Sequence, residues 1–575
     1  MDISELHEDE GKGKSKVIPL CEAVQRNIAP GMKLHVSTGN DPNAALREII
    51  GQFWGKDPQF TLISSGITSP YPISLIHCKL VKKVITANCS YTYPTPRPIP
   101  LLQEAHNKGL IQIESWSLYS LEQRLMAAAL GVGFMPTKSI TATTLAEENA
   151  DSFKVINDPF DGTEIGIVKA LEPDISLVHG CVADKYGNTI LTPPYFTSIW
   201  GLRASKNGVI VTVERLVPPE FIREHGSLVK IPAYLVRSVS VVPFGAHPQS
   251  LASEAIGING GYSEDYDFIL DYQRASRDLN KLNSWLNEWI IDCKAQQDYL
   301  RKLGDERVAH LRGKAHIWQR ELDSRLELST EPIAVMIVIA AREIRRRVIQ
   351  GGHETMLAGI GIPALATWLA YYLLHKEGYE VDLLTGTGLI GYVPSAGDPF
   401  LMTSSNVMSC RMLTDTVEVY GTFVGGARNR CLGILGAAQI DKFGNINTLK
   451  MGNLYFIGAG GAADAVNASE TLVVARQSRE RLIEKVPFIS CRGDKVKTLV
   501  TNLGVFEKFE GDKTFTLTKY FASLGLSKEA QIAEIKENCG WDLKVAEALE
   551  EINPPTTEEL AILGSLDPQG LFIEK

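Results

Sequence analysis

Short apolar segments alternate with longer amphipathic segments along most of this chain. The segments with the length and β-branched content of buried strands lie at 32–37, 60–65, 175–180, 208–214, 354–359 and 471–476. Segments such as 42–53 and 363–376 have the apolar spacing of helices. Alternation of this kind predicts an α/β fold in which mostly parallel sheets are covered by helices on both faces.

Loops rich in small residues follow several of the predicted strands. Because ligands of parallel sheets bind beyond the carboxyl ends of the strands, we expect these loops to face one cleft. The candidate binding residues are Ser37, Thr38, Gly39, Asn40, Gly359, Gly361, Gly386, Thr387, Gly388, Gly460 and Gly461. Small polar residues also form ordinary turns without a ligand, so both interpretations stay open here.

The segment 386–391 reads GTGLIG and satisfies the glycine pattern of dinucleotide-binding loops. In those loops the pattern opens a helix, whose first turn holds the pyrophosphate. Here YVPSAGDP follows, and its two prolines and glycine are incompatible with such a helix. The sequence also lacks the GxSxG elbow of hydrolases and the Walker A motif. We therefore expect no nucleotide cofactor of these kinds.

Two pentapeptides, DKYGN at 184–188 and DKFGN at 441–445, are near copies of each other. Each follows an apolar run and precedes another, and glycine and asparagine tolerate the backbone conformations of tight turns. The pair predicts two structural turns, and its simplest origin is a duplicated supersecondary unit.

The length of 575 residues exceeds one ordinary core, since domains commonly have about 100 to 250 residues. Between two similar halves, the chain becomes rich in charge and tryptophan, and Leu282, Trp285 and Ile290 have helical spacing. We predict a flexible N-terminal tail at 1–16, a first α/β domain at 17–264, a helical connector at 265–330 and a second α/β domain at 331–575.

Composition narrows the function classes. The net charge of −9 argues against nucleic acid as a main partner. The longest apolar run, 332–341, is far shorter than the ~20 residues of a membrane helix. The polar N-terminus lacks the apolar segment of a signal peptide. We therefore expect a cytoplasmic protein without membrane contact. The nine cysteines are scattered without metal-ligand spacing, and we expect neither disulfides nor a metal site.

Blocks of sequence in both halves resemble the two subunits of class I CoA-transferases, and the glutaconate CoA-transferase type most of all. The blocks lie at 34–40, 115–139, 179–188, 209–217 and 241–248 in the first half, and at 341–366, 386–391, 439–447, 458–466 and 566–568 in the second. The resemblance implies two tandem CoA-transferase-like domains formed by fusion of alpha-type and beta-type subunits. It also implies an acyl-CoA substrate that brings its own CoA, no tightly bound cofactor, and a homo-oligomer of fused chains.

The resemblance fails at one position, where the transferases carry a nucleophilic glutamate and this chain has Gly386. Glycine has no side chain to acylate, so the ping-pong reaction cannot run through it. In this respect the chain resembles two kinds of family member that have lost the glutamate. One kind is the ring-opening CoA-thioester hydrolases, which cleave a carbon–carbon bond of a cyclic 3-oxoacyl-CoA. The other is a 3-methylglutaconyl-CoA decarboxylase, which carries a cysteine at this position. The absence of that cysteine favours the hydrolase. The alternatives are the decarboxylase, a transferase with another nucleophile, and a silent CoA-binding protein.

A hydrolase needs a base to activate water, and the resemblance implies a glutamate of the alpha-like half. Glu114 stands at the end of a predicted strand on the cleft side and is the first candidate, and Glu122 is the second. Their structural alternatives are a solvated strand end for Glu114 and a carboxylate on a helix surface for Glu122.

Overall fold

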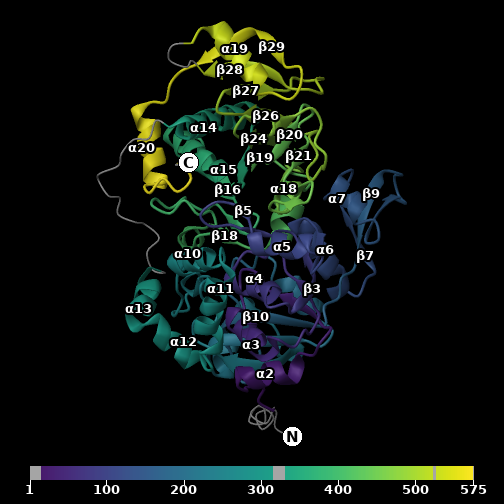
Figure 1. Ribbon diagram of the computed structural model, residues 1–575, viewed down its shortest axis with the longest axis vertical. Helices are drawn as coiled ribbons and strands as arrows, with labels where there is room; N and C mark the ends of the chain where they lie inside the picture. The colour runs from purple at the N-terminus through teal and green to yellow at the C-terminus, as the bar shows by residue number, and fades with distance from the viewer. Residues whose placement is uncertain (1–13, 315–330, 522–525, 574–575) are drawn as a thin grey trace.

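The computed structural model describes residues 14–314, 331–521 and 526–573. It consists of two α/β halves, and Figure 1 shows the first half below the second. The expected tandem arrangement of α/β domains with mostly parallel sheets is confirmed. Residues 1–13 of the predicted tail and 315–330 of the predicted connector lie outside the described residues.

The first half contains a nine-stranded sheet with the strand order β13-β11-β10-β1-β2-β3-β6; in addition, β12 pairs with β10, and β14 pairs with β12. Strands β1, β2, β3, β6, β10, β12 and β14 run parallel to their neighbours in this set. Their bounds are β1 Lys33–Val36, β2 Phe60–Ile63, β3 Val81–Thr86, β6 Gln112–Ser115, β10 Ile175–Ala183, β12 Val209–Leu216 and β14 Val236–Val241. The antiparallel strands are β11 Thr189–Ile190 and β13 Val229–Ile231. The main helices between the strands are α3 Asn43–Phe53, α4 Pro70–His77, α5 Pro100–Asn107 and α6 Leu118–Ala129.

The second half contains a ten-stranded sheet with the order β18-β17-β16-β15-β19-β24-β26-β27-β28-β29. Its central strands β16, β15, β19, β24 and β26 are parallel, β17 and β18 are antiparallel on one side, and on the other side β27 is antiparallel to both β26 and β28, while β29 is parallel to β28. The bounds are β15 Thr355–Ala358, β16 Asp382–Leu384, β17 Leu389–Ile390, β18 Met412–Leu413, β19 Cys431–Gly436, β24 Glu470–Val474, β26 Val496–Val500, β27 Gly504–Glu507, β28 Thr516–Phe521 and β29 Lys544–Ile552. Helices α14 Pro332–Gly351 and α15 Ile362–Lys376 pack on each other, and α20 Thr557–Leu566 packs on both.

The longest apolar run forms the first half of α14, which begins with a proline and buries most of that run. Among the described residues, no helix combines the length and the apolar character that crossing a bilayer requires.

The two DK(Y/F)GN segments form matching turns between short antiparallel strands, as predicted. In each, the aspartate Oδ1 accepts hydrogen bonds from backbone amides inside the turn, at 2.8–3.0 Å for Asp184 and 3.0 Å for Asp441. Gly187 and Gly444 have positive φ angles of 106° and 86°, which other residues rarely adopt. Both aspartates are buried, so these motifs are structural.

The described part of the connector is helical: α10 Tyr266–Ala275, α11 Leu279–Leu286, a π-turn at Asn287–Ile291, α12 Gln296–Leu303 and α13 Asp305–Lys314. Leu282, Trp285 and Ile290 are buried in the core of the first half, as their spacing predicts. Asp265 anchors the start of this segment. It caps α10 through the Phe268 amide, accepts a 2.9 Å bond from His247 Nε2 and forms a bidentate ion pair with Arg307.

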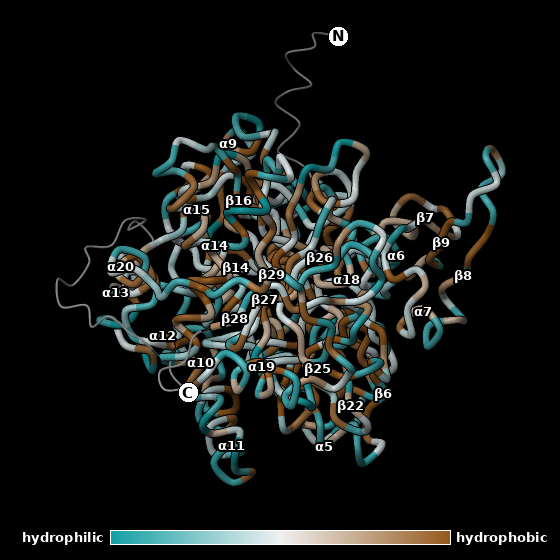
Figure 2. The backbone as a smooth tube through the Cα atoms, turned by 90° about the horizontal axis from the view of Figure 1, so that it is seen from above, coloured by the Kyte–Doolittle hydropathy of each residue, from teal (hydrophilic) through white to brown (hydrophobic). Residues whose placement is uncertain are grey.

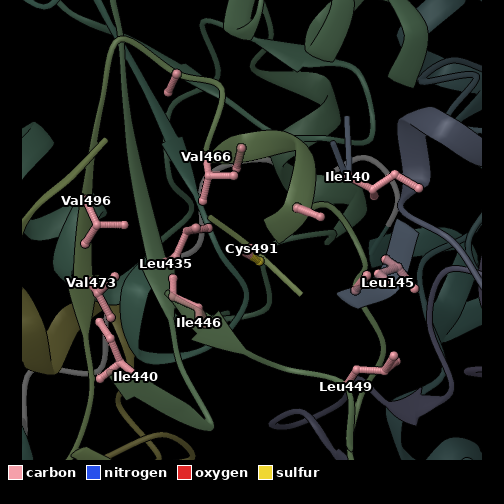
Figure 3. Packing of buried hydrophobic residues seen from close by; sticks show 14 of the residues in the cluster. Ile140, Leu145, Leu435, Ile440, Ile446, Leu449, Val466, Val473, Cys491 and Val496 are labelled. Carbon is pink, nitrogen blue, oxygen red and sulfur yellow. The ribbon is translucent and has the colours of Figure 1, made fainter. Parts of the chain in front are cut away.

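One hydrophobic cluster crosses the boundary between the halves. It contains Ile140 and Leu145 of the first half together with Leu435 and Val466 of the second, and Figure 3 shows these two pairs on opposite sides of Cys491. A shared core of this kind fixes the halves relative to each other, because separating them would expose apolar surface to water. Any cleft along this boundary therefore has defined walls.

An antiparallel arm, β7 Phe134–Thr137, β8 Phe153–Asn157 and β9 Glu164–Lys169, projects from the first half (Figure 2). Its strand order is β7-β9-β8, so β8 is an edge strand. Several apolar side chains of the arm face solvent, and Phe160 is 96% exposed.

Candidate active site

A cavity of about 730 Å³ lies between the two halves and is lined by both. Its walls come from loops at the carboxyl ends of parallel strands, including those after β1, β2, β15, β16, β19 and β24. This is where ligands of parallel sheets are expected to bind. Apolar side chains form much of the wall, among them Phe196, Phe400, Leu401, Met402 and Val407.

Most of the predicted binding residues line this one cavity. They are Thr38, Gly39, Gly359, Gly361, Gly386, Thr387, Gly460 and Gly461. The loops that carry them come from four separate parts of the sequence, and the fold brings them together.

Ser37 and Asn40 lie behind the cavity wall, where both are buried. Ser37 Oγ donates a 2.7 Å hydrogen bond to Ser198 Oγ. Asn40 Nδ2 donates to the carbonyl oxygen of Thr192, and Asn40 Oδ1 accepts from the Thr192 amide, both at 3.1 Å. These two residues hold the loop in place, which leaves Thr38 and Gly39 to face the cavity.

The loop 458–461 closes against the first half through backbone hydrogen bonds. Leu118 N donates to Gly460 O and Gly460 N donates to Ala87 O, both at 2.9 Å. Figure 1 shows the neighbouring helix α18, Ala462–Ala465, directly above α5 and α6 at this boundary. The cavity wall is therefore continuous across the two halves.

The glycine turn at 386–388 is tightly packed on all sides. Gly388 has a φ of +113°, and a Cβ there would lie less than 3.0 Å from Thr414 O, so this glycine is required by the turn and does not line the cavity. Thr416 Oγ1 donates a 2.8 Å bond to Gly386 O, and Thr416 N donates to Phe196 O of the first half.

The side-chain position of Gly386 is filled by another residue. A Cβ on Gly386 would lie less than 3.0 Å from Tyr420 Oη, and a Cβ on Gly461 would do the same. Tyr420 belongs to a short π-helix, Val419–Val424, and lines the cavity. The position that the resemblance aligns with the nucleophilic glutamate thus has no room for a larger side chain while Tyr420 stays in place.

Two carboxyl groups line the cavity. Burial raises the pKa of Asp41 to about 7, and its Oδ2 accepts a 3.1 Å bond from the Gly39 amide. Burial also raises the pKa of Glu264 to about 7, and Glu264 accepts two 3.0 Å bonds from Ser404, through its amide and its hydroxyl. Both carboxyls therefore exchange a proton near neutral pH, and Asp41 accepts fewer hydrogen bonds than Glu264.

Two guanidinium groups, Arg476 and Arg481, line the same cavity beyond the end of β24. Neither forms an ion pair with a carboxylate of the described residues. Burial and the charge of Arg476 lower the pKa of Arg481. An uncompensated cationic pair beside a cavity suits an anionic ligand such as a phosphate.

The structure places the two predicted glutamates outside the cavity lining. Glu114 Oε2 pairs with Lys83 at 2.7 Å, and Oε1 accepts 2.7 and 2.8 Å bonds from Arg124 and the Trp116 indole. Burial opposes ionisation of Glu114, but the Lys83 hydrogen bond and the Arg124 charge outweigh it and lower the pKa. Such a carboxylate is a weak base.

Glu122 is buried at 1% exposure, not on a helix surface, and burial followed by the charge of Asp415 raises its pKa well above the usual range. Its Oε2 has no hydrogen-bond partner in the described part of the chain. Within residues 14–314, 331–521 and 526–573, no three His, Cys, Asp or Glu side chains form a cluster able to hold a metal ion.

Sequence reasoning missed Asp41, Tyr420, Arg476 and Arg481. Asp41 directly follows the predicted loop, and Arg476 is the last residue of a predicted strand, so a position at the carboxyl end of a strand was an available signal for both. Tyr420 had no such signal.

Comparison with known proteins agrees with this geometry. The Coenzyme A transferase family model matches residues 19–241. One of the two subunits of 3-oxoadipate CoA-transferase from Pseudomonas knackmussii is 30% identical over 259 residues, which cover 40% of this chain and 92% of that polypeptide. One of the two subunits of glutaconate CoA-transferase from Acidaminococcus fermentans is 27% identical over 326 residues, covering 52% of this chain and 95% of that polypeptide. The chain belongs to the coenzyme A transferase family.

An uncharacterized protein of Archaeoglobus fulgidus is 30% identical over 253 residues, 44% of this chain, and the match spans 54% of that protein's length. The crystal structure of an acyl-CoA transferase from Escherichia coli O157:H7, a thioester complex with CoA, superposes with a TM-score of 0.64 at 17% identity and covers 94% of this chain and 96% of that one. The single chain thus has the fold of a transferase that contains both halves.

Proposed function

We propose that this chain is a CoA-thioester enzyme that uses water to cleave a carbon–carbon bond of a cyclic 3-oxoacyl-CoA. The observation that carries the proposal is the glycine at 386 together with the phenol that fills its side-chain space. A carboxylate nucleophile has neither an atom nor a place there, so acyl transfer through an enzyme-bound thioester is disfavoured.

The cavity supports the binding of an acyl-CoA. Arg476 and Arg481 offer charge for the CoA phosphates, and backbone amides of the glycine loops offer donors along the pantetheine and thioester. The apolar wall formed by Phe196, Phe400 and Leu401 suits a bulky, ring-containing acyl group. CoA enters with the substrate, so no tightly bound cofactor is needed.

Asp41 is the proposed base, in place of Glu114. Its carboxylate takes a proton from water, and the resulting hydroxide adds to the ring ketone carbon. The bond between that carbon and the α-carbon then breaks, and its electron pair forms the thioester enolate. The proton on Asp41 is transferred to the α-carbon, so water supplies OH to the former ketone carbon and H to the α-carbon of a single ring-opened product. A pKa near 7 suits both proton transfers.

The test is incubation of the purified protein with a panel of acyl-CoAs, including cyclic 3-oxoacyl-CoAs and glutaconyl-CoAs, with and without acetate, in ¹⁸O-labelled water. We expect a ring-opened product that gains one water and carries one labelled oxygen, independent of acetate. Acetate-dependent exchange would establish a transferase, loss of carbon dioxide a decarboxylase, and absence of turnover a silent binder. Each of these three results contradicts the proposal.

We also propose that the chain associates with a second copy through its projecting arm. The edge strand β8 has unpaired backbone groups, and Val155, Ile156 and Phe160 expose apolar surface beside it. Light scattering should give a dimer mass or a multiple of it, and Phe160→Asp should lower that mass. A monomeric wild-type chain would refute the association.

A further inference from the structure

The position of Tyr420 explains why residues 386 and 461 are glycines, although the backbone conformation at neither position requires glycine. Gly461 has φ −85° and ψ −6°, which any residue adopts, and Gly386 is not among the glycines with positive φ. A Cβ at either position would collide with Tyr420 Oη or the adjacent Cζ. The absence of a side chain at both residues therefore leaves the space that the Tyr420 phenol occupies.

The hydroxyl of Tyr420 has no hydrogen-bond partner among the described residues, although the residue is only 6% exposed. Two other buried tyrosines have partners within the protein: Tyr455 bonds Ser115 at 2.8 Å, and Tyr392 bonds the Trp368 indole at 2.9 Å. Its Oη lies beside the side-chain positions of Gly386 and Gly461, which both line the cavity, so a bound ligand can accept the hydrogen bond of Tyr420 there.

The surroundings keep the phenol protonated. Burial raises the pKa of Tyr420 well above its usual value, and the charge of Asp464 adds to the effect. Asp464 accepts a 3.0 Å bond from the Tyr119 amide, and it lines a smaller cavity of about 250 Å³ that also reaches Tyr420. Tyr420 is thus a fixed donor of one hydrogen bond and not a nucleophile.

We propose that Tyr420 Oη donates a hydrogen bond to the thioester oxygen of the bound acyl-CoA. This rests on the proposed function, because the thioester oxygen gains negative charge when the carbon–carbon bond breaks and the enolate forms. The hydrogen bond strengthens as that charge develops and lowers the barrier. No proton leaves Tyr420: the proton that reaches the α-carbon comes from the base. A phenol donor thereby stands where the related transferases place their nucleophile.

The first test compares wild type, Tyr420→Phe and the control Tyr371→Phe, a buried tyrosine outside the cavity with no hydrogen bond of its hydroxyl to the described residues. We expect Tyr420→Phe to lower kcat about 10²-fold, the effect of losing one oxyanion donor. KM, CoA affinity and unfolding temperature should stay close to wild type, because the ring remains and no internal hydrogen bond is lost. Tyr371→Phe should leave kcat unchanged.

A wild-type chain that turns over while Tyr420→Phe keeps its kcat within about threefold would overturn the role of the phenol and leave the proposed function standing. A wild-type chain with no water-dependent turnover would overturn both.

The second test needs no substrate. Gly386→Ala should lower the unfolding temperature when Tyr420 is present and much less in a Tyr420→Ala background, because the collision is then removed. Equal losses in both backgrounds would show that Tyr420 does not occupy the side-chain space of Gly386, and the proposal would fall.

Discussion

Replacement of Asp41 by asparagine should remove activity and increase stability at the same time. The carboxyl lines the cavity, and burial raises its pKa from 3.8 to about 7. Only the ionised form acts as a base, so the ionised fraction is about 10% at pH 6 and about 90% at pH 8. The wild-type rate at low substrate should therefore rise about tenfold per pH unit below pH 7 and level off above it.

The stability of the wild-type protein should fall as pH rises, whereas its activity should rise. The pKa of Asp41 is higher in the folded than in the unfolded chain, so between these values the folded state binds more protons, and the unfolding free energy falls as pH rises. Above pH 7 the full penalty applies, and at 1.36 kcal/mol per unit the rise from 3.8 to about 7 corresponds to at most about 4 kcal/mol. The Asp41→Asn variant has no charge to bury, so its unfolding free energy at pH 8 should exceed that of the wild type by much of this amount.

The assay combines pH–rate profiles with denaturant unfolding of the wild type, Asp41→Asn and the control Asp151→Asn, an exposed turn residue. We expect Asp41→Asn to lose at least about 10²-fold in kcat/KM at pH 8, and to unfold at higher denaturant than the wild type at pH 8 but not at pH 4. Asp151→Asn should match the wild type in both. A pH-independent wild-type rate, or full activity of Asp41→Asn, would refute the role of Asp41.

Three further predictions concern other parts of the molecule. Arg476→Ala and Arg481→Ala should each weaken CoA binding by about 1–3 kcal/mol, measured by calorimetry at low salt, and unchanged affinity in both would place the phosphates elsewhere. Gly388→Ala should lower the unfolding free energy by more than about 1 kcal/mol, and by more than Gly378→Ala, which has a positive φ but open space around its Cβ; equal losses would contradict the packing of the turn. Asp265→Asn should cost about 3–5 kcal/mol at pH 7; because the folded pKa of this carboxyl is depressed, the difference from wild type should shrink as pH falls below about 4, and a pH-independent difference would exclude the ion pair as its cause.

Local sequence determined much of the scaffold. Runs of apolar residues became buried strands, and the two DK(Y/F)GN segments became the same turn, because the conformations of a short apolar run and of a glycine turn depend mostly on neighbouring residues. The resemblance to the transferases implied a missing carboxylate at Gly386, and the identity of that one residue was enough to establish that it has no side chain. The loops that carry Thr38, Gly359 and Gly460 line one cavity, because parallel strands present their carboxyl ends at the same edge.

Only the tertiary structure decided which side chains have usable chemistry. Glu114 is at the end of a strand as expected, yet its carboxylate forms ion pairs with Lys83 and Arg124. Tyr420 enters the space beside Gly386 from a distant π-helix, and nothing in the surrounding sequence indicates it. The pKa of a carboxyl and the hydrogen bonding of a phenol depend on burial and on neighbours that are remote in sequence, so the scaffold followed from local patterns and the chemistry of the site did not.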